Sequence, residues 1–251
     1  MECGDLAPLW VVPVVDAPLA RGRNRSLRSK MIKVQFMLFD LDGTLIDSRR
    51  DLTSSINLML RDVGRPQLDE ETVGGFVGDG VRVLVYRCLT ATHTDHQPPD
   101  DELHKRGIRL MHEHYACEML KTTRLYTGVA ETLRYFSGKR KAVVTSKEVR
   151  FTRLILDHFD IGDCFDCIVG GDTVAARKPD PEPVLAALRT LEAPPADAVM
   201  IGDSENDVKA GRAAGARTCA VAYGFRTAEQ LRVTEPDVLI DRFDQLKDSF
   251  C

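Results

Sequence analysis

The chain shows two kinds of hydrophobic pattern. Short, continuous apolar runs occur near its start and again after residue 126, where they alternate with stretches of helical periodicity. A continuous apolar run is typical of a strand buried on both faces, and strands that alternate with helices are typical of a parallel sheet covered on both sides. We therefore predict an α/β fold with a Rossmann-like parallel sheet core. Strands are expected at residues 32–39, 142–145, 167–169, 198–201, 218–222 and 237–240, and helices at residues 148–158, 183–191 and 207–214.

A block with helical periodicity alone separates the first strand from the others. Leu52, Ile56 and Leu60 fall on one side of a predicted helix, and the Gly-Arg-Pro sequence that follows ends it. No strand is expected between the first strand and about residue 125. We therefore predict an all-α cap, residues 47–125, inserted into the sheet domain after its first strand. Such an insert lies over the edge of the sheet where α/β proteins bind ligands, and it can act as a lid.

The composition narrows the class of partner. The chain has 251 residues and a formal net charge of −4, which argues against nucleic acid as the main partner. No apolar run approaches the roughly 20 residues that a membrane-spanning helix needs, so no membrane partner is expected. Seven cysteines without the spacing of a disulfide framework are typical of reduced thiols. We expect a cytoplasmic protein that is a monomer or a homodimer.

The first 30 residues differ from the rest of the chain. They contain several prolines and then a basic run that ends at Lys30. In a secretory signal the charges precede the apolar stretch, so this order does not fit one. Met31 is followed directly by an apolar strand start. We predict a poorly ordered extension, residues 1–30, ahead of a catalytic core formed by residues 31–46 and 126–251.

Two aspartates end the first apolar run. Asp40 and Asp42 alternate along the expected strand and are followed by Gly43. Alternate strand residues share a side, so the two carboxylates leave the sheet close together. One could attack phosphorus while the other manages the proton of the leaving group. The Asp-Gly pair is also a strong turn signal, so a β-hairpin is an alternative on this segment alone.

Two further polar residues follow apolar segments. Thr145 ends a predicted strand before a helix, where a hydroxyl can bind a phosphate oxygen, although a helix cap is its commoner role. Lys178 precedes prolines that lead into a helix, so it is held at a defined point and could neutralise a phosphoryl group. An isolated lysine in this position would be interpreted as a surface residue.

A second pair of aspartates follows a later apolar strand. Asp203 comes directly after the strand, and Asp207 comes four residues later at a predicted helix start. Helix capping explains Asp207 easily but Asp203 poorly. Together with Asp40 these carboxylates form a hard-oxygen set that suits Mg²⁺ rather than zinc. All four motifs fall at strand ends of one predicted sheet, which favours a shared site.

The motifs resemble those of the haloacid dehalogenase superfamily, in its phosphatase branch with a helical (C1-type) cap. The likeness covers residues 32 to about 240 and includes the four core segments described above. Four further segments resemble the phosphoglycolate phosphatase subfamily, namely residues 77–85, 126–129, 170–174 and 177–181.

The resemblance implies a role for each core residue. Asp40 would be the nucleophile that becomes an aspartyl-phosphate. Asp42 would protonate the leaving alkoxide and then deprotonate the attacking water. The implied ligands of Mg²⁺ are Asp40, the backbone carbonyl of Asp42, Asp203 and Asp207. The implied phosphate-binding residues are Thr145, Ser146 and Lys178, and the implied substrate-binding residues of the cap are Gly78, Asp79, Gly80 and Arg82.

Two positions depart from the family pattern. Ser146 stands where the family often has Asn, which should leave the backbone donors unchanged. Asp79 stands in a cap loop that commonly reads Gly-Asn-Gly. A carboxylate that faces an anionic substrate would weaken binding unless it points away or pairs with Arg82.

The expected reaction is Mg²⁺-dependent hydrolysis of a small phosphorylated metabolite, with 2-phosphoglycolate as the leading substrate. A sugar-phosphate mutase of the β-phosphoglucomutase type and a pyrophosphatase share the core motifs and are alternatives. Dehalogenases and phosphonoacetaldehyde hydrolases lack an aspartate at the position of Asp42, which argues against both. An inactive phosphate-binding module is the non-enzymatic alternative, although such a module would not need all six core side chains.

Overall fold

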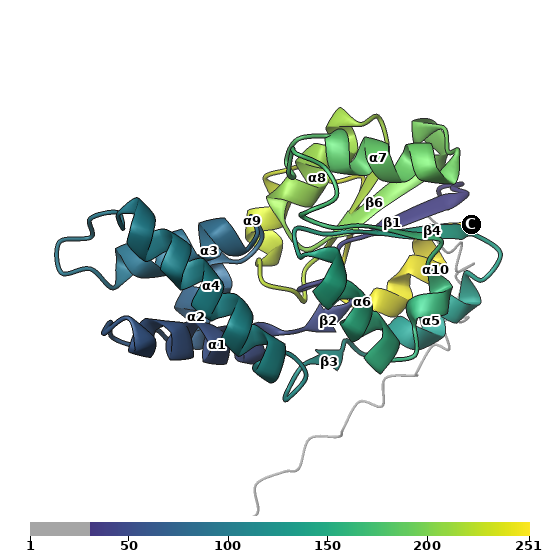
Figure 1. Ribbon diagram of the computed structural model, residues 1–251. Helices are drawn as coiled ribbons and strands as arrows, with labels where there is room; N and C mark the ends of the chain where they lie inside the picture. Colours follow the sequence, from purple (N-terminus) through teal and green to yellow (C-terminus); the bar gives the residue numbers. More distant parts are fainter. Residues whose placement is uncertain (1–30) are drawn as a thin grey trace, which may run out of the picture.

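Six parallel strands form the central sheet, in the order β5-β4-β1-β6-β7-β8 (Figure 1). The computed structural model describes residues 31–251, so the predicted N-terminal extension lies outside the described residues. The predicted parallel α/β sheet is confirmed. The strand before Asp40 lies at its centre. The strands are β1 (Phe36–Phe39), β4 (Arg140–Val144), β5 (Cys167–Val169), β6 (Ala198–Gly202), β7 (Arg217–Val221) and β8 (Val238–Ile240).

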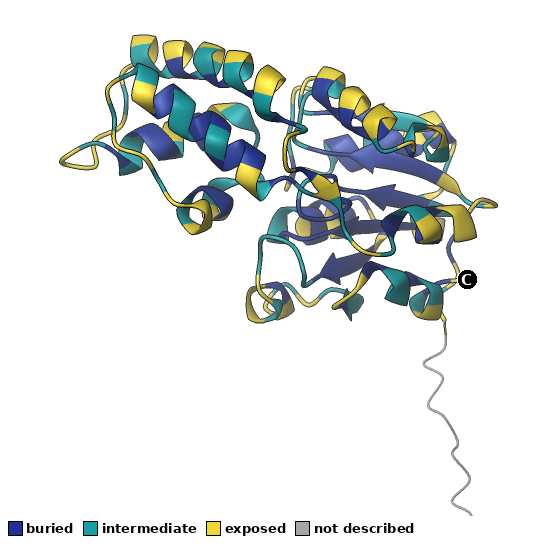
Figure 2. Ribbon diagram, turned by 90° about the horizontal axis from the view of Figure 1, so that it is seen from below, coloured by how far each residue is buried: buried dark blue, intermediate teal, exposed yellow. Residues whose placement is uncertain are grey.

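Helices cover both faces of the sheet because side chains alternate along each strand. Met37 and Phe39 of β1 belong to the hydrophobic cluster that includes α5, α6 and α10, whereas Leu38 belongs to the cluster on the other face with α7 and α8. Figure 2 shows the strands buried between these two layers. The helices of the core are α5 (Val129–Tyr135), α6 (Val149–His158), α7 (Glu182–Leu191), α8 (Glu205–Ala213), α9 (Ala228–Arg232) and α10 (Leu246–Ser249), with short 3₁₀ helices η1 (Gly162–Cys164), η2 (Pro195–Asp197) and η3 (Phe243–Gln245).

The first four of the five helices between β1 and β4 form a separate lobe, which we call the cap (Figure 1). Its longest helix, α4, packs against α1 and α3, and buried Met59, Val85 and Met111 contribute to their shared core. Asp100 begins α4 by accepting a 2.8 Å hydrogen bond from the backbone N–H of Leu103. The cap helices are α1 (Arg49–Asp62), α2 (Glu70–Phe76), α3 (Val81–Ala91) and α4 (Asp101–Glu118).

A short antiparallel pair of strands joins the cap to the core. β2 (Ile46–Asp47) pairs with β3 (Arg124–Leu125). The expectation that no strand occurs between β1 and about residue 125 is therefore wrong at this point, because two residues are too few to produce a recognisable alternation. No helix within residues 31–251 is long and apolar enough to cross a membrane.

Candidate active site

Three adjacent strands bring polar residues to one edge of the sheet. Asp40, Thr145 and Asp203 follow the carboxyl ends of β1, β4 and β6, which are neighbours in the order β4-β1-β6. The backbone N–H of Asp40 donates to the carbonyl of Ile201, so β1 and β6 remain paired up to the site. All three side chains are almost completely buried. The parallel register therefore fixes their positions before any ligand binds.

A compact acidic cluster lies at this edge. Asp40, Asp203 and Asp207 each offer a carboxylate oxygen within 4.8 Å of the others. The Lys178 Nζ atom donates to Asp40 Oδ1 at 2.9 Å, to Asp207 Oδ1 at 2.6 Å and to the carbonyl of Val144 at 2.8 Å. Asp207 also caps helix α8, because its Oδ2 accepts hydrogen bonds from the backbone and hydroxyl of Ser204. The ammonium group of Lys178 thus donates hydrogen bonds to two of the three carboxylates.

The electrostatics of this cluster suit a divalent cation. Burial raises the pKa of Asp40 to about 6; Lys178 opposes this shift and Asp207 adds to it. Burial, together with the charges of Asp40 and Asp207, raises the pKa of Asp203 well above its usual range. Three buried carboxylates around one ammonium leave negative charge uncompensated. An all-carboxylate donor set of this kind fits Mg²⁺, so the residues present match the predicted cation.

Gly43 leaves room for the carboxylate of Asp203. A Cβ atom on Gly43 would lie 2.1 Å from Asp203 Oδ2, and the φ of Gly43 is +83°. This backbone conformation is unfavourable for residues with a side chain. The Asp-Gly pair seen in the sequence therefore makes a tight turn beside Asp203 rather than a β-hairpin between long strands. The same oxygen, Asp203 Oδ2, accepts a 2.6 Å hydrogen bond from the backbone N–H of Phe225.

Asp42 occupies a different environment from Asp40. Its Oδ1 accepts a 2.5 Å hydrogen bond from the hydroxyl of Ser48, and its Oδ2 lies 3.2 Å from Lys147 Nζ. Lys147 Nζ in turn donates to the hydroxyl of Tyr115, on cap helix α4, at 2.6 Å. Sequence reasoning did not identify Lys147 or Tyr115. The signal for Lys147 was its place directly after Thr145 and Ser146, but its orientation depends on how the cap packs.

The two predicted phosphate-binding hydroxyl residues lie differently. Thr145 and Ser146 both line the cavity beside the acidic cluster. The Thr145 Oγ1 atom accepts a 3.2 Å hydrogen bond from the backbone N–H of Lys147. The hydroxyl of Ser146 donates instead to the carbonyl of Gly78 in the cap loop, at 2.7 Å. Ser146 therefore joins the core to the cap through its side chain, which leaves its backbone N–H as its expected phosphate donor.

Of the four predicted cap residues, Gly78 and Gly80 line the same cavity, whereas Asp79 and Arg82 do not. Asp79 Oδ2 forms a 2.6 Å ion pair with Arg87, and Asp79 Oδ1 accepts a 2.7 Å hydrogen bond from Asn206 of the core. Arg82 is the second residue of α3 and is exposed to solvent. The considered pairing of Asp79 with Arg82 was thus wrong. Arg87, further along α3, forms the ion pair because it lies on the side of the helix that faces the loop.

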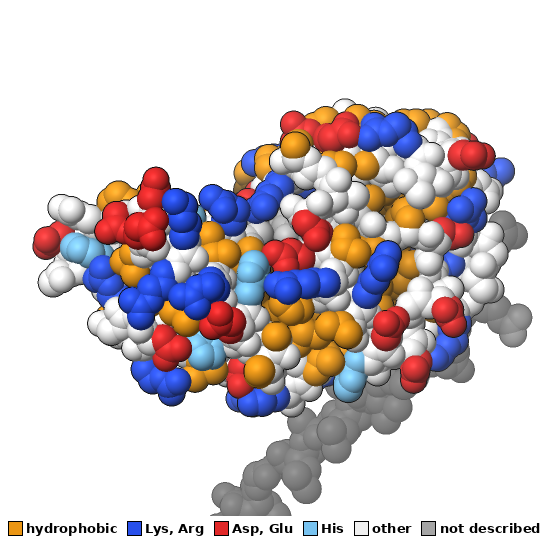
Figure 3. Space-filling model, viewed as in Figure 1, with side chains coloured by type: hydrophobic (Ala, Val, Ile, Leu, Met, Phe, Trp, Pro, Cys, Tyr) orange, Lys and Arg blue, Asp and Glu red, His pale blue; other side chains and the backbone are white. Residues whose placement is uncertain are grey.

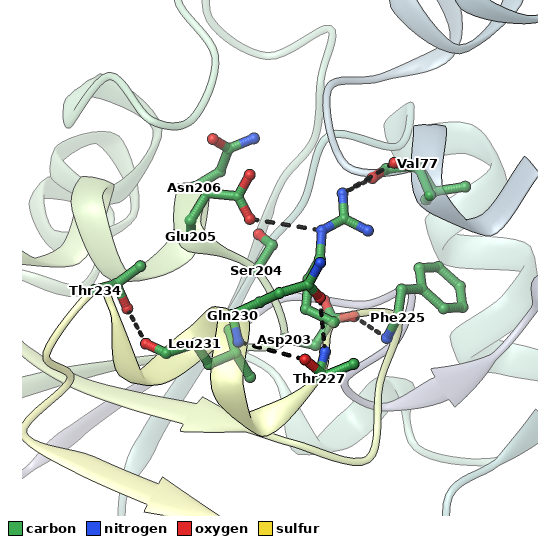
Figure 4. Close-up of polar contacts among 12 residues, drawn as sticks. Val77, Asp203, Ser204, Glu205, Asn206, Phe225, Thr227, Gln230, Leu231 and Thr234 are labelled. Carbon is green, nitrogen blue, oxygen red and sulfur yellow. Dashed lines mark hydrogen bonds and ion pairs between the residues drawn. The ribbon is translucent and has the colours of Figure 1, made fainter. Parts of the chain in front are cut away.

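An arginine of the core also holds the cap. Arg226, which follows Phe225, donates to the carbonyls of Gly74, Gly75 and Val77 at the end of α2, and its Nε lies 3.5 Å from Glu205. Figure 4 shows Val77 and Glu205 on opposite sides of this contact and Phe225 next to Asp203. Orphan carbonyls at a helix end are favourable partners for a cation. These contacts place the cap directly over the acidic cluster.

A cavity of about 80 Å³ separates the cap from the core. One buried water needs roughly 10–15 Å³ on the same measure, so the space suits a small molecule. On the face shown in Figure 3, side chains of both charges gather where the two lobes meet. The cavity is lined by apolar residues of the cap and the core, among them Leu52, Val81, Leu84, Met111 and Phe151, and by the charged residues Asp40, Asp42, Lys147, Glu148, Asp203 and Arg226.

Comparison with known proteins assigns the chain to a family. A family model described as haloacid dehalogenase-like hydrolase matches residues 37–221. The chain belongs to this family of enzymes, and the resemblance inferred from its motifs is confirmed.

The relatives narrow the likeness to phosphatases. The phosphoglycolate phosphatase of Pseudomonas savastanoi pv. phaseolicola is 38% identical over 214 residues, which cover 84% of this chain and 78% of that protein. A solved structure described as a predicted phosphoglycolate phosphatase, from Haemophilus somnus, has a TM-score of 0.82 at 31% identity and covers 86% of this chain and 98% of its own. A mutant of CbbY from Rhodobacter sphaeroides, solved with xylulose-(1,5)bisphosphate, has a TM-score of 0.74 at 25% identity and covers 87% of this chain and 100% of its own.

Proposed function

We propose that this protein is a Mg²⁺-dependent phosphomonoester hydrolase that acts through an aspartyl-phosphate on 2-phosphoglycolate or a similar small metabolite. The observation that carries the proposal is the convergence of Asp40, Lys178, Asp203 and Asp207 within one buried cluster, with Asp42 beside it. The names of the relatives support phosphoglycolate as the substrate. The small cavity supports a compact phosphate ester over a larger one.

The proposed reaction has two steps. In the first, the Asp40 carboxylate attacks phosphorus, the bond between phosphorus and the ester oxygen breaks, and Asp42 gives its proton to the leaving alkoxide. In the second, Asp42 takes a proton from water as the water oxygen attacks phosphorus, which releases inorganic phosphate and restores Asp40. The ammonium of Lys178, beside Asp40, neutralises charge on the phosphoryl group during both steps, and Thr145 orients the phosphoryl oxygens.

The environments of the two aspartates fit these different tasks. Asp40 lies against Lys178, which holds its carboxylate in one orientation. Asp42 accepts a hydrogen bond from Ser48 and faces the cavity, where a leaving group would be released. When bound by Asp40, Asp203, Asp207 and the backbone carbonyl of Asp42, Mg²⁺ would supply the charge that lets an anionic substrate approach these carboxylates.

The cap has a proposed role in the same reaction. We propose that residues 47–125 act as a lid that admits the substrate and then excludes bulk water. The contacts that Ser146 and Arg226 make with cap-loop carbonyls are those that opening would break.

Phosphate release from a panel of substrates tests the proposed function. We expect release from 2-phosphoglycolate with Mg²⁺ and none when the metal is chelated, and little release from hexose phosphates or pyrophosphate. Asp40→Asn should lower turnover by at least roughly a thousandfold while its circular dichroism and melting temperature stay close to those of the wild type. Asp241→Asn, at an exposed position after β8, is the matched control. Substantial activity in Asp40→Asn would refute the nucleophile, and transfer of phosphate to a second sugar hydroxyl would indicate a mutase.

A further inference from the structure

A buried lysine that the proposed reaction does not use faces the cavity. The side chain of Lys147 is only 8% exposed, and its Nζ lies between Asp42 Oδ2, at 3.2 Å, and the Tyr115 hydroxyl, at 2.6 Å. The same ammonium lies 4.3 Å from the centre of the Tyr115 ring. Both residues line the cavity, one from the core and one from cap helix α4. A charged group buried at this depth points to a function in the cavity.

Lys147 and Tyr115 have more hydrogen-bond donors than their contacts within residues 31–251 use. An ammonium carries three N–H bonds, and two of those on Lys147 are directed at Asp42 and Tyr115. Because Tyr115 accepts from Lys147, its own O–H proton is left for another acceptor. Burial raises the pKa of Tyr115 to about 12, so the phenol keeps that proton at neutral pH. One N–H and one O–H can therefore point together at an anionic group in the cavity.

Two other cations of the site, Lys178 and Arg226, are engaged in different contacts. Lys178 donates to Asp40, Asp207 and a backbone carbonyl beneath the acidic cluster. Arg226 donates to cap carbonyls and pairs with Glu205. Glu148, which also lines the cavity, lies 3.0 Å from His112 and offers no attraction to an anion. Lys147 is the cation placed beside the residue that is proposed to protonate the leaving oxygen.

The chemistry of a short phosphorylated acid matches this position. In 2-phosphoglycolate a single methylene separates the ester oxygen from the carboxylate. If Asp42 meets the ester oxygen, the carboxylate falls within a few ångströms of Asp42, which is where Lys147 and Tyr115 lie. Charge-assisted hydrogen bonds to a carboxylate are among the stronger polar contacts, and burial strengthens them further.

We propose that Lys147 and Tyr115 form a carboxylate subsite, which makes the enzyme selective for small esters that carry a carboxylate next to the phosphorylated carbon. This inference rests on the proposed phosphatase function and adds the residues that choose the substrate. Because Tyr115 belongs to the cap and Lys147 to the core, a bound carboxylate also bridges the two lobes. The subsite is therefore complete only when the cap lies over the core.

The test compares two esters that differ in this one group. The probes are 2-phosphoglycolate and 2-hydroxyethyl phosphate, in which a hydroxymethyl group replaces the carboxylate. Both are assayed with Mg²⁺ on the full chain and on Lys147→Met and Tyr115→Phe. Matched controls are Lys105→Met, on the exposed side of α4, and Tyr135→Phe, which is 61% exposed. Melting temperatures identify any variant that fails to fold.

We expect the wild type to prefer 2-phosphoglycolate. Lys147→Met should lower kcat/KM for 2-phosphoglycolate by roughly ten- to a hundredfold more than for 2-hydroxyethyl phosphate, and Tyr115→Phe should show a selective loss of about three- to tenfold. The controls should leave both values unchanged. Because Tyr115→Phe removes only one oxygen atom, we expect this variant to fold. It can therefore test the subsite even if Lys147→Met is unstable.

Three results would overturn the subsite. Equal losses on both substrates in both variants would mean that Lys147 only positions Asp42. A wild-type enzyme that hydrolyses 2-hydroxyethyl phosphate as well as 2-phosphoglycolate would remove the carboxylate preference while leaving the phosphatase function intact. A wild-type enzyme inactive on both esters would refute the proposed function, and this inference with it.

Discussion

The Nη2 atom of Arg226 donates a 3.0 Å hydrogen bond to the carbonyl oxygen of Val77, across the boundary between the core and the cap. The preceding residue, Phe225, donates its backbone N–H to Asp203 in the acidic cluster. Two consecutive residues of one loop therefore contact the cap and the proposed cation site. If the cap acts as the proposed lid, we expect its movement to change the position of Asp203 through this peptide segment.

Arg226→Met should loosen the cap. The substitution keeps a long side chain but removes the hydrogen bonds to the end of α2 and the pairing with Glu205. Since hydrogen bonds from a charged group contribute about 1.5–3 kcal/mol each and are not additive, we expect KM for 2-phosphoglycolate to rise by about tenfold. Amide hydrogen exchange in α2 should quicken as well. Arg232→Met, on the exposed side of α9, is the control. Unchanged amide exchange in α2 would contradict the expectation that Arg226 holds the cap.

A second prediction concerns the junction between the lobes. Asp51, in the first turn of α1, is buried and accepts hydrogen bonds from the backbones and hydroxyls of Thr122 and Thr123. Burial by itself would raise the pKa of Asp51, but these hydrogen bonds outweigh it and hold the pKa below its usual range. The ionised carboxylate therefore stabilises the folded state.

The sign of the pH dependence follows from the lowered pKa. The stabilisation by Asp51 is fully present above the pKa of an unfolded aspartate, about 3.9, and is lost as the pH falls through the lower folded value. Asp51→Asn should reduce the free energy of unfolding by about 2 kcal/mol at pH 7, and the difference from wild type should shrink below pH 4. Urea unfolding from pH 7 to pH 3 measures this, with exposed Asp101→Asn as the control. A difference that grows on acidification would show that the carboxylate does not act as described.

The core of the site was predictable because backbone topology places it. Asp40, Thr145 and Asp203 each end an apolar strand, and the carboxyl ends of neighbouring parallel strands share one edge. Lys178 lies on a loop whose prolines restrict its position. Periodicity and strand order therefore sufficed to group these residues, without knowledge of any side-chain contact.

The residues that complete the cavity were not predictable in the same way. Lys147, Tyr115 and Arg226 act through the packing of the cap on the core, and no local pattern encodes that packing. The antiparallel pair β2 and β3 was missed because each strand has only two residues. The sequence patterns therefore predict which segments form helices and strands, but not how the cap is oriented on the core.

The direction of the Asp79 carboxylate changes the prediction about how an anionic substrate binds. Its carboxylate lies in the cap loop, where an unpaired negative charge would repel an anionic substrate. The ion pair with Arg87, at 2.6 Å, and the hydrogen bond from Asn206 direct that carboxylate away from the cavity lining. Asp79 should therefore be compatible with 2-phosphoglycolate as long as Arg87 is present.

A double-mutant cycle tests this compensation. Asp79→Asn alone should change KM for 2-phosphoglycolate by less than about threefold, because the carboxylate is already neutralised. Arg87→Met alone should raise KM by about five- to tenfold, since it leaves Asp79 unpaired next to the cavity. The combination of both substitutions should return KM close to the wild-type value, because the charge to be balanced is gone. If the double variant binds as weakly as Arg87→Met, then Arg87 acts through its hydrogen bond to the Phe76 carbonyl and not through the charge of Asp79.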